Sequence, residues 1–255
     1  MPEPAFQRAV KFAAKRALER WIRLGVPRVR PRVVRRVPHD TGAFTQGLAW
    51  CDGLLYESTG GDTTSSVRAV DPATGEVQRL VPVDGDFAEG IAVLGEHLYQ
   101  LAFVSGHARV YRLPTLERAG QRHYTGEGWG LAATPDGQLL ASDGTSLLRR
   151  FDESFAVVGH LAVRSRGLPV RWLNDLECVG PRIYANIYAA RDLAEIDARS
   201  GRVLRFVDCG ELVREAAPAE EYAVLNGIAY NSQAGTFFLT GKHWPTLFEV
   251  EIPDN

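Results

Sequence analysis

The 255-residue chain lacks the cysteine and histidine patterns that bind metals in proteins. Its three cysteines, Cys51, Cys178 and Cys209, are far apart and form no CxxC, which argues against a zinc knuckle or a dithiol redox site. The six histidines show no HxH or HExxH spacing. We therefore expect no metal site, and we place the cysteines in or near a hydrophobic core.

Long hydrophobic runs are missing as well. No segment is long enough to cross a bilayer as a helix, so an integral membrane protein is excluded. The N-terminal stretch lacks the continuous apolar segment of a secretory signal. These absences favour a cytoplasmic or membrane-peripheral location, and the lack of a linker-like segment beyond residue 36 favours one domain.

The charge is unevenly distributed along the chain. Residues 1–36 carry eleven Lys/Arg and two Glu, a net charge of +9, so an overall charge of -2 leaves -11 for the remainder. Apolar residues recur there at helical spacing, namely Phe6, Val10, Ala14, Ala17, Trp21 and Leu24. We predict a basic amphipathic helix within an extension over residues 1–31. Packing across the domain is favoured over docking on an anionic membrane surface, and no nucleic-acid partner is expected.

A short pattern recurs five times in the rest of the chain. The segments that align are QGL at 46–48, EGI at 89–91, WGL at 129–131, NDL at 174–176 and NGI at 226–228. Two further strand-like runs follow each segment, and the first four units continue through a turn into a fourth run. Four short strands per unit of about 40–45 residues are typical of a β-propeller. We therefore predict an all-β, five-bladed propeller over residues 32–255.

The fifth unit is one strand short. The run RVVRRV at 32–37 precedes the first unit and has no other partner, so we expect it to supply the outer strand of the last blade. The longer spacing before the fifth unit falls around residues 211–222, where we predict a short helical insertion. Turns such as Asp71–Gly75 carry Asp, Pro and Gly at hairpin offsets.

The repeat also predicts a site. The residue before each repeat glycine, or its equivalent, should lie in a ring at one end of the propeller axis; these residues are Gln46, Glu89, Trp129, Asn174 and Asn226. A second ring, from the second strands, holds Gly60, Phe103, Thr145, Tyr188 and Lys242, and Phe44 and Phe87 add aromatic surface. One carboxylate, one ammonium and several amides among aromatic rings suit a small polar ligand.

Nine motifs, spread in order over about residues 37–252, resemble the plant- and bacterial-type glutaminyl cyclases. They are HDTGAFTQGL (39–48), YESTG (56–60), FAEGIAV (87–93), GWGLA (128–132), SDGTS (142–146), LNDLE (173–177), ANIY (185–188), LNGIAY (225–230) and TGKHWPTLFEV (240–250). The resemblance implies a five-bladed propeller that converts N-terminal glutamine of peptides to pyroglutamate and releases ammonia, without a metal or other cofactor.

The resemblance also implies roles for single residues. Glu89 would be the catalytic acid and base, and Asn174 and Lys242 would be polar catalytic residues. Substrate-binding positions would be Phe44, Gln46, Phe87 and Trp129, to which the two rings of the repeat add Phe103, Tyr188 and Asn226. Tryptophan is usual where Phe103 and Tyr188 stand, and Glu is common where LNDLE has Asp175; the two aromatic changes bear on substrate preference and turnover.

Two other interpretations stay open at this point. A propeller could keep the same residues and only bind a small polar ligand or a peptide N-terminus. A lactonase-like propeller hydrolase is less favoured, because such sites gather carboxylates around a divalent ion and the predicted ring has one carboxylate and a lysine. We expect peptides or proteins with N-terminal glutamine as partners, and a monomer.

Overall fold

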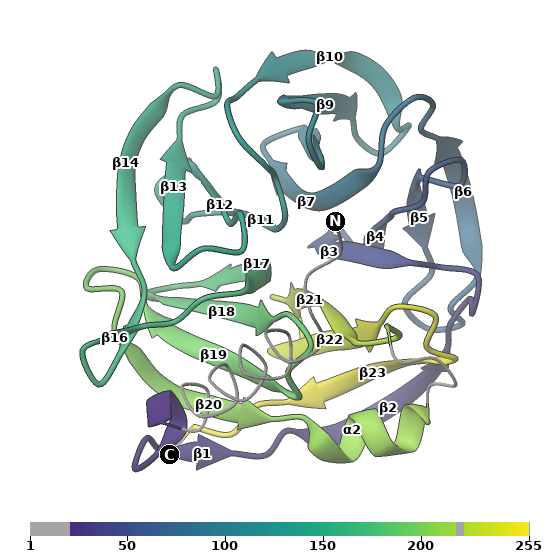
Figure 1. Ribbon diagram of the computed structural model, residues 1–255. Helices are drawn as coiled ribbons and strands as arrows, with labels where there is room; N and C mark the ends of the chain where they lie inside the picture. Colours follow the sequence, from purple (N-terminus) through teal and green to yellow (C-terminus); the bar gives the residue numbers. More distant parts are fainter. Residues whose placement is uncertain (1–20, 218–221, 255) are drawn as a thin grey trace, which may run out of the picture.

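The strands form five sheets around a common axis in the computed structural model, which describes residues 21–217 and 222–254 (Figure 1). The first blade contains β3 (Thr45–Cys51), β4 (Leu54–Thr59), β5 (Ser66–Val70) and β6 (Val77–Pro82). The second contains β7 (Ala88–Leu94), β8 (His97–Ala102), β9 (His107–Arg112) and β10 (Glu117–His123). The third contains β11 (Leu131–Ala133), β12 (Leu139–Ala141), β13 (Leu147–Phe151) and β14 (Val157–Ala162).

The last two blades each include a strand from the N-terminal part of the chain. The fourth contains β17 (Leu173–Val179), β18 (Arg182–Ile187), β19 (Asp192–Asp197), β20 (Val203–Asp208) and β1 (Arg28–Val29). The fifth contains β21 (Leu225–Asn231), β22 (Thr236–Gly241), β23 (Thr246–Glu251) and β2 (Arg32–Pro38). A small hairpin of β15 (Arg164–Ser165) and β16 (Leu168–Pro169) links the third and fourth blades. The predicted five-bladed propeller is confirmed.

Strand β2 closes the ring as the sequence pattern predicts. It pairs antiparallel with β23, with Arg32 opposite Glu251 and Val37 opposite Leu247. Its exposure alternates, and Val37 is buried against the interface of the fifth and first blades. The edge of β23 is thereby covered by a strand from the other end of the chain.

Strand β1 is not among the predicted elements. It pairs parallel with β20, with Arg28 opposite Phe206. Two residues in parallel pairing leave no periodic pattern, which is why the sequence does not reveal this strand. The sheet pairing of the propeller thus begins at Arg28, four residues before the start of the predicted closing strand.

The predicted N-terminal helix falls largely on residues 1–20, which lie outside the described residues. Its last described turn, residues 21–23, is helical. The predicted apolar stripe is wrong at Trp21 and Leu24, which are more than half exposed, whereas Ile22 is buried between the third and fourth blades. The helix ends at Arg23, and hydrogen bonds from Ser165 and Arg166 to the carbonyls of Ile22 and Leu24 fix this turn on the β15–β16 hairpin.

The hydrophobic core is divided among the interfaces between neighbouring blades. Five apolar clusters of described residues each join two adjacent blades; Val67 and Leu98 lie in the cluster between the first and second blades. The middle strands are buried along nearly their whole length because sheets cover both of their faces, whereas the outer strand β10 is largely exposed. This stacking holds the inner strands β3, β7, β11, β17 and β21 in contact around the axis.

Two smaller predictions are also confirmed. Helix α2 (Gly210–Ala216) lies in the predicted insertion before the fifth blade. In the turn after β5, Asp71 Oδ1 accepts hydrogen bonds from the N–H groups of Ala73 and Thr74, and Gly75 takes a φ of 77° that favours glycine. No helix among the described residues is long and apolar enough to cross a membrane.

Candidate active site

Three members of the predicted inner ring meet through hydrogen bonds at the entrance to the innermost strands. Each is the second residue of its strand: Gln46 in β3, Glu89 in β7 and Asn226 in β21. The amide nitrogen Nε2 of Gln46 donates to Glu89 Oε1 over 3.1 Å. Asn226 Nδ2 donates to the backbone oxygens of Thr45 and Gln46 over 3.1 and 3.2 Å. All three side chains are buried.

Lys242 completes this group from the turn after β22. Its Nζ donates a hydrogen bond to Gln46 Oε1 and lies 4.1 Å from the centre of the Phe44 ring, a cation–π contact. Backbone hydrogen bonds from Lys242 to Val224 and from His243 to Ala43 hold the turn in place. Gln46 therefore lies between Glu89 and Lys242: its side-chain nitrogen donates to the Glu89 carboxylate and its side-chain oxygen accepts from the Lys242 ammonium.

Burial changes the acidity of both charged groups. It raises the pKa of Glu89 well above its ordinary value, although the nearby Lys242 cation opposes the change and the charges of Asp175 and Glu127 add to it. Burial also lowers the pKa of Lys242 to about 8, against the opposing charges of Glu89 and Asp175. A carboxyl with a raised pKa and an amine with a lowered pKa are suited to moving protons.

Aromatic rings form two groups near these polar residues. In the first, the ring centres of Phe44 and Phe87 are 6.0 Å apart, and those of Phe87 and Phe103 are 6.2 Å apart. In the second, Trp129 lies edge-on to Tyr188 at 6.1 Å and beside Trp172 at 6.4 Å. Phe103 and Tyr188, which stand where tryptophan is usual, thus each contact another aromatic ring of the predicted site.

Two glycines make room for these rings. A Cβ atom on Gly60 would lie 2.3 Å from the Phe87 ring, and one on Gly144 would lie 2.7 Å from the Trp129 ring. Gly60 is a member of the predicted second ring, and its place there is explained by the ring of Phe87. The place of Thr145 in that ring stays a prediction; its side chain is exposed and its hydroxyl donates a hydrogen bond to Asp143 in its own turn.

Asn174 is buried at the start of β17, and no described hydrogen bond joins its side chain to Glu89 or Lys242. Its Oδ1 atom has no hydrogen-bond partner among the described residues, whereas its backbone oxygen accepts from Ser142 Oγ over 2.8 Å. A buried amide atom without a protein partner is available to a ligand. The catalytic role of Asn174 stays a prediction.

Asp175 plays a structural part that repeat alignment does not reveal. The equivalent positions in the other blades are glycines, and a Cβ on Gly90 or Gly130 would collide with the backbone of the next inner strand. The fully buried Asp175 carboxylate instead extends to two other blades, where Oδ2 accepts hydrogen bonds from Leu48 N over 3.3 Å and Ile228 N over 2.8 Å. The break in the glycine pattern is the signal that could have pointed to it.

Other residues near the site were not predicted. Trp172 is 40% exposed and joins the Trp129 group with a positive φ of 66°. Glu127 accepts a hydrogen bond from Trp129 Nε1 over 3.0 Å, and Tyr222 lies 6.4 Å from the Phe44 ring. None of them occupies a fixed place in the repeat. Among residues 21–217 and 222–254, no group of His, Cys, Asp and Glu is arranged to hold a metal ion.

Comparison with known proteins identifies the family to which this site belongs. The family model for glutamine cyclotransferase matches residues 7–252. The chain belongs to the glutamine cyclotransferase family. It is 39% identical over 227 residues to the glutaminyl-peptide cyclotransferase of Arabidopsis thaliana, a match that covers 86% of this chain and 70% of that protein.

A solved structure of a family member has the same fold. The crystal structure of Myxococcus xanthus glutaminyl cyclase superimposes with a TM-score of 0.84 at 38% sequence identity, covering 90% of this chain and 100% of that chain. These matches confirm the resemblance read from the nine motifs, and they confirm that the protein is a transferase of the glutamine cyclotransferase family with a propeller fold.

Proposed function

We propose that this protein is a glutaminyl-peptide cyclotransferase, which converts the N-terminal glutamine of peptides or proteins to pyroglutamate and releases ammonia. The observation that carries the proposal is the buried hydrogen-bonded series Glu89–Gln46–Lys242, bordered by the Phe44 and Phe87 rings. Family membership and the similarity to the Arabidopsis enzyme support it.

The reaction needs a proton carrier between two nitrogens. The α-amine of the substrate attacks its own side-chain carboxamide carbon, a new C–N bond closes the five-membered ring, and the old C–N bond breaks to release ammonia. The amine attacks in its neutral form, which its pKa of about 7.7–8.0 makes accessible near neutral pH. We assign the proton transfer to Glu89, which as a carboxylate takes a proton from the attacking nitrogen and delivers it to the leaving nitrogen. The raised pKa of Glu89 suits both halves of this exchange.

Charge also develops on the carboxamide oxygen during the attack. Lys242 is the cation of the site, and its ammonium can stabilise that oxygen while Gln46 holds it in place. The unpartnered Oδ1 atom of Asn174 would accept a hydrogen bond from the substrate. The aromatic rings would fold the flexible glutamine side chain toward the ring-closing geometry, which lowers the entropic part of the barrier.

Ammonia release from a Gln-initiated peptide tests the proposal. The wild-type protein should release ammonia, and Glu89→Gln, which keeps the shape and removes the acid, should lower kcat about 10²–10⁴-fold. A peptide with N-terminal asparagine is the matched substrate control. Full activity in Glu89→Gln would remove Glu89 from the mechanism, and an inactive wild type that still binds the peptide would favour the binding-only alternative.

Metal independence is a separate part of the proposal. We expect ammonia release to be unchanged after dialysis against a strong chelator, because the assigned proton carrier and cation are both side chains. Loss of activity that returns with a divalent ion would favour the hydrolase-like alternative. The expected monomer and a membrane-surface contact of the N-terminal helix stay predictions, which light scattering and vesicle co-sedimentation would check.

A further inference from the structure

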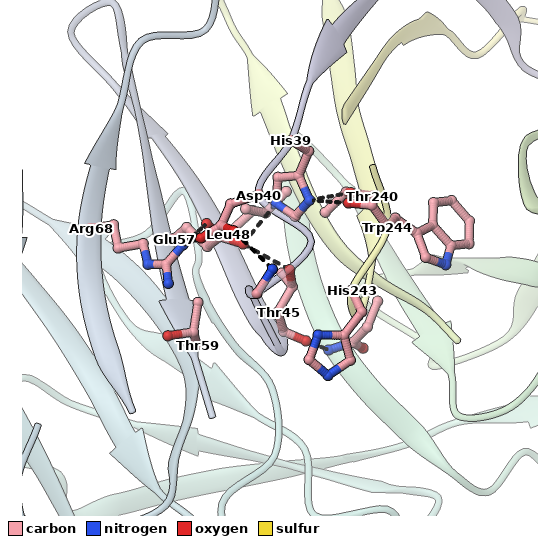
Figure 2. A network of polar contacts seen from close by, with 12 residues as sticks. His39, Asp40, Thr45, Leu48, Glu57, Thr59, Arg68, Thr240, His243 and Trp244 are labelled. Atoms are coloured by element: carbon pink, nitrogen blue, oxygen red, sulfur yellow. Dashed lines mark hydrogen bonds and ion pairs between the residues drawn. The ribbon is translucent and has the colours of Figure 1, made fainter. Parts of the chain in front are cut away.

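A second polar network lies beside the active site and contains His39, in the segment between β2 and β3 (Figure 2). The side chain of His39 is only 6% exposed, and that of its partner Glu57, on β4, is 3% exposed. His39 Nε2 lies 3.0 Å from Glu57 Oε1, and His39 Nδ1 lies 2.7 Å from the backbone oxygen of Trp244. Figure 2 shows the imidazole between the Glu57 side and the Thr240–Trp244 side of this network.

These partners determine the protonation state of the ring. A carboxylate oxygen and a carbonyl oxygen can only accept hydrogen bonds, so both ring nitrogens of His39 must donate. Thr240 Oγ1 donates to Thr246 O over 2.9 Å and therefore turns a lone pair toward His39 Nδ1, 3.5 Å away. Both hydrogen bonds are satisfied only when His39 is an imidazolium. A neutral ring would place a lone pair against one of two buried oxygens.

The charged groups around the ring favour the cation. Glu57 faces it from β4, Asp40 follows it in its own segment, and Arg68 on β5 lies 2.8 Å from Asp40 Oδ2 and 3.8 Å from Glu57 Oε2. Among the described residues, the hydrogen-bond partners of the ring from the fifth blade are the Trp244 carbonyl and the Thr240 hydroxyl. Burial lowers the pKa of His39, but the charge of Glu57 and the hydrogen bond to it raise that pKa above its ordinary value. Glu57 in turn has a lowered pKa, so it stays ionised over the neutral range.

The network joins the two segments that carry Gln46 and Lys242, namely the start of β3 and the turn after β22. On one side, Glu57 Oε1 also accepts a hydrogen bond from Thr45 Oγ1 over 2.7 Å, and Thr45 directly precedes Gln46. On the other side, His39 contacts Trp244 and, through its backbone N–H, Pro245 O over 3.0 Å, two and three residues beyond Lys242. His39 thus connects the start of β3 to the turn that positions Lys242.

We propose that His39, as an imidazolium paired with Glu57, is a positioning residue that holds the Lys242 turn against Gln46, so that the Gln46–Lys242 contact depends on the protonation of His39. Loss of that proton removes one of the two hydrogen bonds and loosens the turn, which backbone hydrogen bonds such as that from His243 to Ala43 still connect to the segment before β3. The catalytic consequence rests on the proposed function, whereas the protonation state and the placement do not.

Glu57→Gln is the sharpest test, because it removes the charge while keeping an oxygen for Thr45 and His39. Without the anion, burial is opposed by fewer groups and the His39 pKa should fall below its raised value in the wild type, so kcat should drop as the pH rises through this lower midpoint, with KM nearly unchanged. Below the midpoint kcat should approach that of the wild type. His39→Gln should be less active at every pH without this transition, and the exposed His160→Gln is the matched control with a wild-type profile.

A constant loss of kcat at all pH values in Glu57→Gln, or an effect on KM alone, would overturn the proposal. A second measurement needs neither activity nor a stable variant. The ¹⁵N signals of His39 in the ¹⁵N-histidine-labelled wild-type protein should show two protonated ring nitrogens at neutral pH. A neutral His39 at this pH would also overturn the proposal. An imidazolium in a protein without cyclase activity would contradict only the proposed function.

Discussion

Gln46 uses both ends of its side-chain amide in the site, since its nitrogen faces the acid and its oxygen faces the cation. The two ends cannot be exchanged, because a flipped amide would place an N–H₂ group against the Lys242 ammonium. This arrangement fixes the orientation of Gln46 without any contact from substrate. The distance between Glu89 and Lys242 is consequently set by one side chain rather than by a direct ion pair.

Removal of the cation should change the acidity of the carboxyl. The positive charge of Lys242 lowers the pKa of Glu89, so Lys242→Met should raise that pKa further. If Glu89 works as a carboxylate, the acid limb of kcat/KM then moves to higher pH, and activity near neutral pH falls about 10²–10³-fold. Measured pH profiles of kcat/KM check this. Lys242→Arg keeps the charge and should leave the limb in place, and an unmoved limb in Lys242→Met would contradict the coupling.

At the scale of elements, the turn after β4 is shaped to accept an aromatic ring from the second blade. Gly60 has an ordinary backbone conformation, so its requirement for glycine comes mainly from the Phe87 ring, with the Gln46 Cγ atom next at 3.0 Å from the position of a Cβ. Phe87 directly precedes β7, which carries Glu89. Space in one blade therefore controls the position of a ring in the next.

Gly60→Ala should test this spacing without removal of any functional group. The added methyl should displace Phe87, lower kcat/KM by up to about 10²-fold and destabilise the fold by about 1–3 kcal/mol. Gly159→Ala is the matched control, because its nearest neighbour is an Arg150 carbon 3.7 Å away, an ordinary contact. Steady-state kinetics and urea unfolding of both variants provide the check, and wild-type kinetics in Gly60→Ala would refute the steric argument.

Asp175 links three inner strands through one carboxylate. Asp175→Ala leaves the N–H groups of Leu48 and Ile228 without this acceptor, at a cost of about 1–3 kcal/mol for each buried donor. Asp175→Asn keeps one oxygen and should lose less. Unfolding free energies from urea titration measure both variants. Equal losses would mean that packing at the axis, and not hydrogen bonding, explains the residue.

The repeated sequence pattern predicts some residues of the site and not others. Gln46, Glu89 and Asn226 were predicted because they occupy one position of every unit, so a shared register places them together. The same reasoning does not reveal that the Thr145 hydroxyl is engaged by Asp143 in its own turn. The contact between His39 and Glu57 has no counterpart in the other blades. It forms only once the first and fifth blades are adjacent, and the sequence carries no signal for it.

At the scale of the whole molecule, closure of the ring depends on the packing of one outer strand. Val37 is buried between the fifth and first blades, whereas Val34 on the same strand is nearly half exposed. Substitutions at the two positions therefore distinguish the contribution of buried packing from that of the exposed face of the same strand.

Val37→Thr and Val34→Thr form a matched pair that tests this contribution. A hydroxyl at residue 37 would be buried in an apolar cluster and should lower the unfolding free energy by about 1–3 kcal/mol. The exposed position should change it by no more than about 0.5 kcal/mol. Tryptophan fluorescence during urea unfolding measures both, and equal effects would argue against a role of Val37 in closure.

The pairing of β2 with β23 also has a consequence for the order of events on the ribosome. The two strands are separated by about 200 residues, which translation at about 5–20 residues per second needs about 10–40 s to add. During that interval β2 has no sheet partner, and Lys242 has not yet been synthesised for Gln46 to bind. The nascent chain thus remains inactive while its first four blades form, and catalysis can begin only after the fifth blade emerges.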